Sequence, residues 1–353
     1  DYYTKSLLEM GLVSFNSNQT DKAIEFYKKI LEESPMSPEA QSALAGLENI
    51  YQERGEADQY LAFIDKLGIS SSKSPDEREV MIFNSSEKLY LSGNYPSAAA
   101  SLISFLNRYP DGSKSTQASF YLGESLQKLS KPEQARDAFL KVMEKGTGSF
   151  SELATLNYAR ISYSLQDYQE ALKGYSTLSM IAALDNNKKE AYLGKLNSFF
   201  MLRQYENSLA ESENAPRFNL SGQELEQVKY ITAKSFYLLG ERAKAIPLLR
   251  ELSKNKMTPQ GAECAYLIIS NHFDNGDFDS VEKEVFALSD SGTPQRYWLA
   301  KSYILLGDSY AERENWEQAE ATFKSILESY ESGTEDDIAE QIKIRLDKIR
   351  NRE

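Results

Sequence analysis

The sequence predicts an all-α protein, an α-solenoid of about nine helix–turn–helix repeats with a C-terminal capping helix. A small side chain recurs at steps of 36–38 residues along the 353-residue chain. Apolar side chains recur at i, i+3, i+4 and i+7 between these positions, which is the period of a helix. No segment shows the sustained alternation of apolar and polar residues that is typical of a β-strand.

The repeat is defined by two positions in the second helix of each helix pair. The first is small in most repeats and is occupied in order by Ala23, Tyr60, Ala98, Ala135, Ala171, Ser208, Ala245, Val281 and Ala319. The second lies four residues later and is occupied by Tyr27, Ile64, Leu102, Phe139, Tyr175, Ser212, Leu249, Val285 and Phe323. Nine repeats in steady register indicate one unit used many times.

Each repeat is expected to contain two helices joined by a short break, such as SGNYP, LSKPE or NGDF. The second helix runs for about 14 residues and often ends near Pro, Gly or Ser. Two antiparallel helices can approach closely only where a side chain is small, and Gly123 and Ala135 are expected to meet this need. A single helix pair leaves one face uncovered, so the repeats are expected to stack.

The array of about nine repeats is predicted to cover residues 1–333, and the capping helix residues 334–353. That last segment carries one apolar stripe on a polar helix, formed by Ile338, Ile342, Leu346 and Ile349. The first helix differs, because it begins almost at Asp1 and is apolar nearly all round. We therefore expect the chain to be a fragment of a longer one with further repeats upstream.

The net charge of −13 is unfavourable for a nucleic-acid groove, which needs a basic surface, so no nucleic-acid partner is predicted. It is also unfavourable for broad adhesion to an anionic membrane. No run of 18 apolar residues occurs, and no direct membrane insertion is predicted. Cys264 is the only cysteine, so an internal disulfide is excluded.

The repeat resembles the tetratricopeptide repeat (TPR), whose pattern is W-x2-L-G-x2-Y…A-x3-F…P. The ninth repeat matches it best, with Tyr303, Leu306, Gly307, Tyr310, Ala319 and Phe323, and the first repeat matches with Leu7, Gly11, Ala23, Tyr27 and Pro35. The resemblance implies a right-handed superhelix whose first helices line a concave surface. The period of about 37 residues is longer than the usual 34, so each link is longer.

The segment GNYPSAAASLISFLNRYPDGSKSTQASFYLG, in the third and fourth repeats, resembles a narrower group of bacterial envelope TPR proteins. That group includes the accessory protein of the Tol–Pal system and the TPR lipoprotein of the outer-membrane β-barrel assembly machine. The resemblance implies a periplasmic or outer-membrane-associated scaffold in a Gram-negative bacterium, with a membrane-associated complex as a possible setting. A cytoplasmic location is the alternative.

The concave line of first helices supplies the candidate partner-binding residues. One position along it is aromatic in six of nine repeats, including Tyr90, Tyr163, Phe200, Tyr237 and Phe273. Aromatic side chains are favoured at binding hot spots, and such a line would accept an extended peptide or an amphipathic helix. The alternative is that these rings pack against neighbouring helices and thicken the core.

A second position of the line carries charge, and Arg160, Asn197 and Lys234 occupy it in successive repeats, 37 residues apart. The two cations would hold an acidic side chain or a terminal carboxylate, and Asn197 would bond the peptide backbone. The alternative is a set of solvated charges. The family's carboxylate clamp needs Lys and Asn in the first two repeats, and Leu8, Leu12, Ala45 and Asn49 do not supply it.

Catalysis is not predicted, and neither is a metal or cofactor. His272 is the only histidine, so no catalytic triad or histidine-based metal site can form. The stretch GTGS at 146–149 lacks the Lys and the spacing of a P-loop. The sequence therefore predicts a non-catalytic scaffold that binds a protein or peptide in its concave groove. The alternatives are a cytoplasmic TPR adaptor and a structural spacer within a longer repeat protein.

Overall fold

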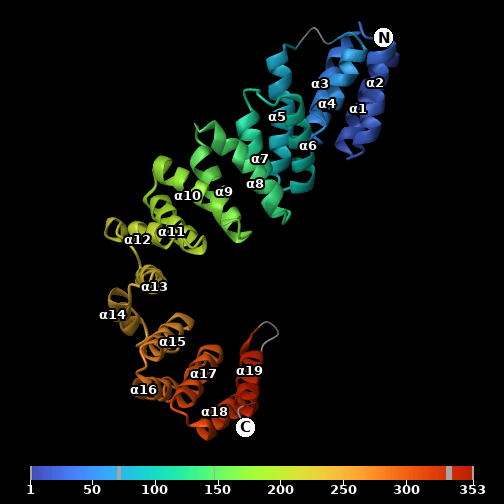
Figure 1. The fold of residues 1–353 in the computed structure, drawn as a ribbon. Coiled ribbons are helices and arrows are strands. Elements are labelled where there is room, and N and C mark those ends of the chain that lie inside the picture. The colour runs from blue at the N-terminus through green and yellow to red at the C-terminus, as the bar shows by residue number, and fades with distance from the viewer. Residues whose placement is uncertain (1, 70–72, 147, 331–335, 352–353) are drawn as a thin grey trace. The chain divides into compact units, whose positions relative to one another are not determined.

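The computed structural model describes residues 2–69, 73–146, 148–330 and 336–351 (Figure 1). Its described residues form helices and turns, without a strand, which confirms the predicted all-α solenoid. The predicted boundary at residues 333/334, the start at Asp1 and Thr147 of the GTGS stretch lie outside the described residues.

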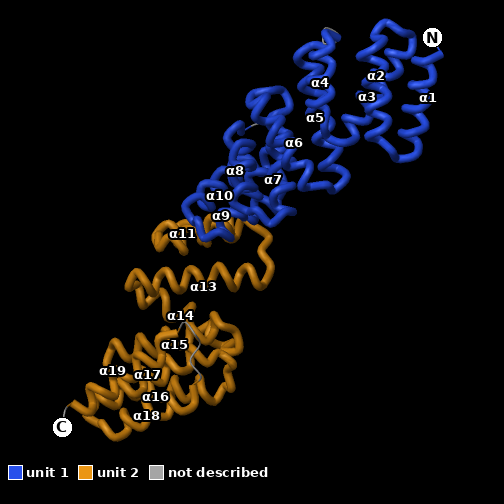
Figure 2. Tube along the Cα trace, turned by 90° about the vertical axis from the view of Figure 1, so that its right-hand side faces the viewer, with its two compact units in different colours: residues 1–191 blue, residues 192–353 orange. Residues whose placement is uncertain are grey.

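The chain divides into two compact units, which Figure 2 colours separately. The N-terminal unit comprises residues 1–191 and the C-terminal unit residues 192–353, with the division inside α11.

The helices of the N-terminal unit form five consecutive pairs. They are α1 (Tyr2–Asn16) and α2 (Thr20–Glu33), α3 (Pro38–Glu53) and α4 (Ala57–Lys66), α5 (Pro75–Leu91) and α6 (Tyr95–Arg108), α7 (Ser115–Lys128) and α8 (Pro132–Lys145), and α9 (Ser151–Ser164) and α10 (Tyr168–Ile181).

The remaining helices continue the same alternation. They are α11 (Asp185–Met201) and α12 (Tyr205–Ser212), α13 (Gly222–Leu238) and α14 (Arg242–Leu252), α15 (Pro259–Asp274) and α16 (Phe278–Ser289), α17 (Arg296–Glu312) and α18 (Trp316–Ser329), and the final α19 (Ile338–Arg350). A short 3-10 helix, Ala215–Arg217, follows the eight-residue α12. The recurring position that is occupied by Leu, Ile, Val or an aromatic residue in the other repeats is Ser212 here, at the end of the shortest second helix.

The predicted register is confirmed by burial at the recurring small position. All nine residues there, from Ala23 to Ala319, are at most 1% exposed. In three repeats, a glycine of the first helix packs against the large residue of the second helix, as Gly11 does against Tyr27 and Gly307 against Phe323. A Cβ added to Gly123 would lie 2.7 Å from the ring of Phe139, which is fully buried and has no room to move. The small residues therefore set how closely the two helices of a repeat approach.

The turn between the two helices of every repeat contains one left-handed residue, always at the same place in the repeat. These residues have positive φ and are Asn18, Gly55, Gly93, Ser130, Gln166, Arg203, Gly240, Gly276 and Glu314. Each lies five residues before the recurring small position. A left-handed residue after the last turn of a helix lets following backbone N–H groups bond its free carbonyls, as Asn94 N does to Leu89 O. The turn is therefore a local signal that recurs with the repeat.

In two repeats, a glutamate of the first helix forms hydrogen bonds with the link that leads to the next repeat. Glu152, in the first turn of α9, accepts hydrogen bonds from Ala183 N at 3.1 Å, Leu184 N at 3.3 Å and Asn187 Nδ2 at 2.7 Å. Glu79 in α5 likewise accepts from Ser113 Oγ and Lys114 N. These carboxylates bond backbone groups that precede the next first helix, so they fix where that helix begins.

The Glu152 contacts predict a pH-dependent contribution to stability. The hydrogen bond from Ala183 N, followed by that from Asn187, holds the pKa of Glu152 below its usual range. A carboxyl group whose pKa is depressed in the folded state contributes stability above its unfolded pKa, and loses it as pH falls through the folded pKa. Glu152→Gln should therefore lower the free energy of unfolding at pH 7, and the difference from the wild type should shrink below about pH 4.

Urea unfolding of the two proteins between pH 7 and pH 3 measures this difference. Glu133→Gln is the matched control, because Glu133 is an exposed acid in the first turn of α8 without a hydrogen-bond partner among the described residues. A gap between Glu152→Gln and the wild type that stays constant down to pH 3 would contradict the assignment.

Candidate functional site

The first helices of the C-terminal unit enclose a pocket that contains three of the predicted binding residues. Its volume is about 660 Å³. Its lining comes from α11, α13 and the start of α15, and comprises Asn197, Phe200, Met201, Gln223, Glu226, Gln227, Tyr230, Ile231, Lys234, Thr258 and Gln260. The volume lies in the range of small-molecule and peptide side-chain sites.

Helical spacing explains how these side chains come together. Asn197 and Phe200 are three residues apart on α11, and Tyr230 and Lys234 are four apart on α13, so each pair shares one helix face. The step of 37 residues places Lys234 one repeat after Asn197. The predicted line of first-helix positions therefore contributes to this pocket from two adjacent repeats.

The ammonium group of Lys234 is bound by side chains of the same chain. Its Nζ lies 2.7 Å from Glu263 Oε1 and donates a hydrogen bond to Tyr230 Oη at 3.1 Å. It also lies 5.6 Å from the centre of the Phe200 ring and 5.4 Å from that of Tyr230. The charge of Lys234 is thus neutralised by a carboxylate of the next first helix.

Tyr230 donates its hydroxyl hydrogen to the second oxygen of Glu263. Burial, with the nearby Glu263 charge and this hydrogen bond, raises the pKa of Tyr230 well above its usual value. The phenol therefore stays protonated and acts as a donor to Glu263. Together, Tyr230, Lys234 and Glu263 form a connected group behind one wall of the pocket.

Asn197 also bonds within the chain. Its Nδ2 donates to Leu193 O at 2.6 Å, and its Oδ1 accepts from Gln227 Nε2 at 2.9 Å. The same spacing of 30 residues joins Glu87 to Gln117, and Arg160 to Glu190, whose carboxylate the Arg160 guanidinium bonds through two nitrogens. The polar position of the concave line is therefore used to connect successive first helices.

Three polar groups of the pocket have no hydrogen bond or ion pair among the described residues. They are Gln223, Glu226 and Gln260, and all three are exposed. Phe200, Met201 and Ile231 supply apolar surface beside them. The pocket thus combines an apolar area with carboxamides that are free to bond a ligand.

The other predicted binding residues lie elsewhere. Tyr90 stacks on Tyr121 with ring centres 4.3 Å apart and donates to Glu124, and burial raises its pKa. Tyr163 packs edge-on against Tyr168 at 5.2 Å. Tyr90, Arg160 and Tyr163 belong to the N-terminal unit, and the three residues of the pocket to the C-terminal one.

Two further predicted residues lie in the C-terminal unit but outside this pocket. Tyr237 is 7% exposed and packs within the core beneath the Arg242 guanidinium, so it offers little area to a partner. Phe273 is partly buried against Phe278 and lines a different pocket.

The sequence analysis did not predict Glu263 and Gln227. Glu263 forms an ion pair with Lys234, and Gln227 donates a hydrogen bond to Asn197. A usable signal was present, because a complementary polar residue follows at about 30 positions in each case. Glu226, Gln223 and Gln260 were missed because exposed polar residues are common on helices and carry no pattern of their own.

Two observations concern metal binding and nucleophilic chemistry in the described part of the chain. No group of three or more His, Cys, Asp or Glu side chains could hold a metal ion there. Burial raises the pKa of the Cys264 thiol to about 12, so this cysteine is a poor nucleophile. Among the described helices, none is long and apolar enough to span a membrane.

Comparison with solved structures gives matches of low sequence identity. A tetratricopeptide repeat protein from Parabacteroides merdae is 17% identical, with 71% of this chain and 92% of that chain covered and a TM-score of 0.27. Pseudomonas aeruginosa pilF is 18% identical, with 64% and 95% covered and a TM-score of 0.32. The apo form of the quorum sensor NprR from B. thuringiensis is 13% identical, with 92% and 97% covered and a TM-score of 0.37.

Sequence comparison is more specific. None of the curated proteins matches the chain. The tetratricopeptide repeat family model matches residues 5–37, 117–145 and 296–332, which contain the pairs α1–α2, α7–α8 and α17–α18. The helix pairs between these matches keep the same register of buried small residues and left-handed turns. The chain therefore contains tetratricopeptide repeats at these three regions.

Proposed function

We propose that this protein is a non-catalytic interaction scaffold that binds an extended peptide segment of a partner protein at the pocket around Asn197, Phe200 and Lys234. Tetratricopeptide-repeat proteins generally mediate protein–protein interactions, and their fold generally serves as a non-catalytic scaffold. The observation that carries the proposal is the pocket itself, which α11, α13 and the start of α15 form and which includes three predicted concave positions.

The chemistry of the lining favours an extended peptide over a helix. Gln223 and Gln260 each present both a donor and an acceptor, which match the N–H and C=O groups of a peptide main chain. These main-chain groups are free in an extended segment and already bonded in a helix. Phe200, Met201 and Ile231 would receive one apolar side chain of the peptide.

Lys234 has a different role from the one the sequence suggests. Because Glu263 already neutralises it, Lys234 would have to exchange one carboxylate for another to hold an acidic ligand. We therefore expect Lys234 to support the wall formed by Phe200 and Tyr230. Lys234 should therefore add little to the salt dependence of binding.

The first experiment is peptide-display selection on the purified chain, followed by affinity measurement with a selected peptide. The double substitution Gln223→Ala with Gln260→Ala should weaken binding by about thirtyfold, since it removes two sets of main-chain hydrogen bonds of roughly 1 kcal/mol each. Phe200→Ala should weaken it further. Gln134→Ala with Gln169→Ala, on exposed faces of the second helices α8 and α10, is the matched control.

The outcomes separate the candidate functions. A selected peptide that binds the double variant as tightly as the wild type would refute this pocket. Failure to select any peptide would favour the structural spacer within a longer repeat protein.

A location in the bacterial envelope is part of the proposal. The resemblance of residues 93–123 to envelope TPR proteins supports it, and the cytoplasmic adaptor is the alternative. Fractionation of the source cells with an antibody against this chain tests it. Recovery with the periplasmic or outer-membrane fraction is expected, and recovery with the cytoplasmic fraction would refute it.

A further inference from the structure

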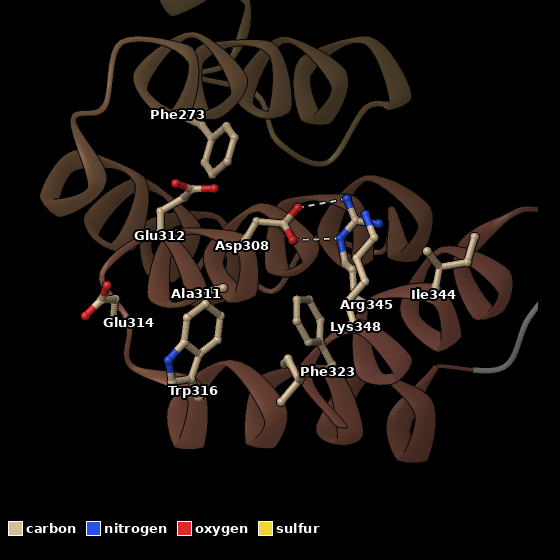
Figure 3. A pocket seen from close by; sticks show the side chains of 11 residues that line it. Phe273, Asp308, Ala311, Glu312, Glu314, Trp316, Phe323, Ile344, Arg345 and Lys348 are labelled. Atoms are coloured by element: carbon tan, nitrogen blue, oxygen red, sulfur yellow. Dashed lines mark hydrogen bonds and ion pairs between the residues drawn. The ribbon is translucent and has the colours of Figure 1, made fainter. Parts of the chain in front are cut away.

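A second pocket lies at the end of the array, where α15, α17, α18 and α19 meet (Figure 3). Its volume is about 520 Å³. It shares no residue with the pocket around Asn197, so the two can be tested separately. Its lining includes the rings of Phe273 and Trp316 and the carboxylates of Asp308, Glu312 and Glu314.

The charges in this pocket are unevenly matched. Arg345 bonds Asp308 through two nitrogens, with Nε–Oδ1 at 2.7 Å and Nη2–Oδ2 at 2.8 Å, so these two neutralise each other. Glu312 and Glu314 have no ion pair among the described residues. The end of α17 and the following turn determine where these two residues lie. Glu312 is the last residue of α17, and Glu314 is the left-handed residue of the turn.

Aromatic rings accompany the two unpaired carboxylates. In Figure 3 the Glu312 carboxylate points toward the Phe273 ring, and the Trp316 ring stands below Ala311. The small side chain of Ala311, at a position that is aromatic in most repeats, leaves space between them. A cation over a ring is attracted by its π face, and tryptophan provides the strongest such site.

We propose that this pocket receives an arginine side chain from a partner protein. The guanidinium would stack against Phe273 and donate hydrogen bonds to Glu312, whose carboxylate faces that ring, while the Glu314 carboxylate points away from both rings. Arginine fits better than lysine because its planar fork can bond a carboxylate through two N–H groups while it stacks on a ring. Lys348 also lines the pocket, from the face of α19 that carries Arg345, so the carboxylate side is the negative end.

The two tryptophans of the chain make a direct test possible. Trp298 packs on Tyr266 and Tyr297 and does not line the pocket, so Trp298→Phe leaves Trp316 as the single fluorescent reporter. The probes are the capped tripeptides acetyl-Gly-Arg-Gly-amide and its citrulline analogue, which keeps the shape and loses the charge. We expect a saturable change in Trp316 emission with the arginine peptide, and at least tenfold weaker binding of the citrulline peptide.

Substitutions locate the interaction. Glu312→Gln should weaken binding of the arginine peptide at least tenfold, whereas Glu317→Gln, an exposed acid on α18 outside the pocket, should leave it unchanged. Far-UV circular dichroism checks the fold, and Glu312→Ala serves if the glutamine variant is unstable. No saturable change, equal binding of the citrulline peptide, or binding of acetyl-Gly-Asp-Gly-amide instead would overturn the proposal. Any of these results would leave the pocket around Asn197 untouched.

Discussion

Replacing Ala135 with arginine is expected to unfold the α7–α8 helix pair and to lower the free energy of unfolding by about 4 kcal/mol or more. Ala135 has no exposed surface, at the recurring position where the two helices of the repeat approach most closely. Arginine cannot fit there without separating the helices, and its charge would be buried without a partner. The measurement is urea unfolding followed by circular dichroism.

The matched control is Gln134→Arg, which introduces the same side chain one residue earlier, on the exposed face of α8. It should change the stability by less than about 0.5 kcal/mol. Because each repeat contacts mainly its neighbours, hydrogen exchange should show the damage of Ala135→Arg concentrated near α7 and α8. An unchanged unfolding curve for Ala135→Arg would refute the repeat register.

Replacing Glu263 with alanine is expected to lower the free energy of unfolding substantially. Glu263→Ala would leave the Lys234 ammonium and the Tyr230 hydroxyl without their shared acceptor, in a site where the Glu263 side chain is only 12% exposed. Breaking a buried pair by removing one partner is costly because the other charge stays uncompensated. We expect a loss of about 3 kcal/mol in the free energy of unfolding.

Two comparisons separate this cost from an ordinary surface effect. Glu284→Ala removes the more exposed pair with Arg250, whose atoms are 3.0 Å apart, and should cost less than about 1 kcal/mol. The double change Lys234→Met with Glu263→Met should recover most of the stability, since no unpaired charge remains. If Glu263→Ala costs no more than Glu284→Ala, then Glu263 is not the buried anchor of this wall.

Much of the fold could be predicted because its signals are local. Ala135 and Gly123 mark the place where two neighbouring helices meet, and that requirement recurs at every repeat with the same spacing. The divergent residues Tyr60 and Val281 lie in the same register and are equally buried, so the period carries information that a single residue does not.

The candidate site could be predicted only in part. Asn197, Phe200 and Lys234 were expected on the concave line, and they do line one pocket. Tyr237 stands in the same frame position as Phe200 and is buried, because the Arg242 side chain and the next repeat cover it. The role of Arg160 and Lys234 as free cations could not be judged from spacing, since their partners Glu190 and Glu263 lie about 30 residues away.

The class of the fold, the length of the repeat and the register of its helices follow from the amino-acid sequence, because side-chain size and turn geometry act between neighbouring segments. Which charges remain available to a partner depends on the tertiary structure. Lys234 is committed to Glu263, while Glu312 and Glu314 have no ion pair among the described residues. The physical reason is that an ion pair forms only where two side chains meet across different repeats, and that meeting depends on how the helices pack.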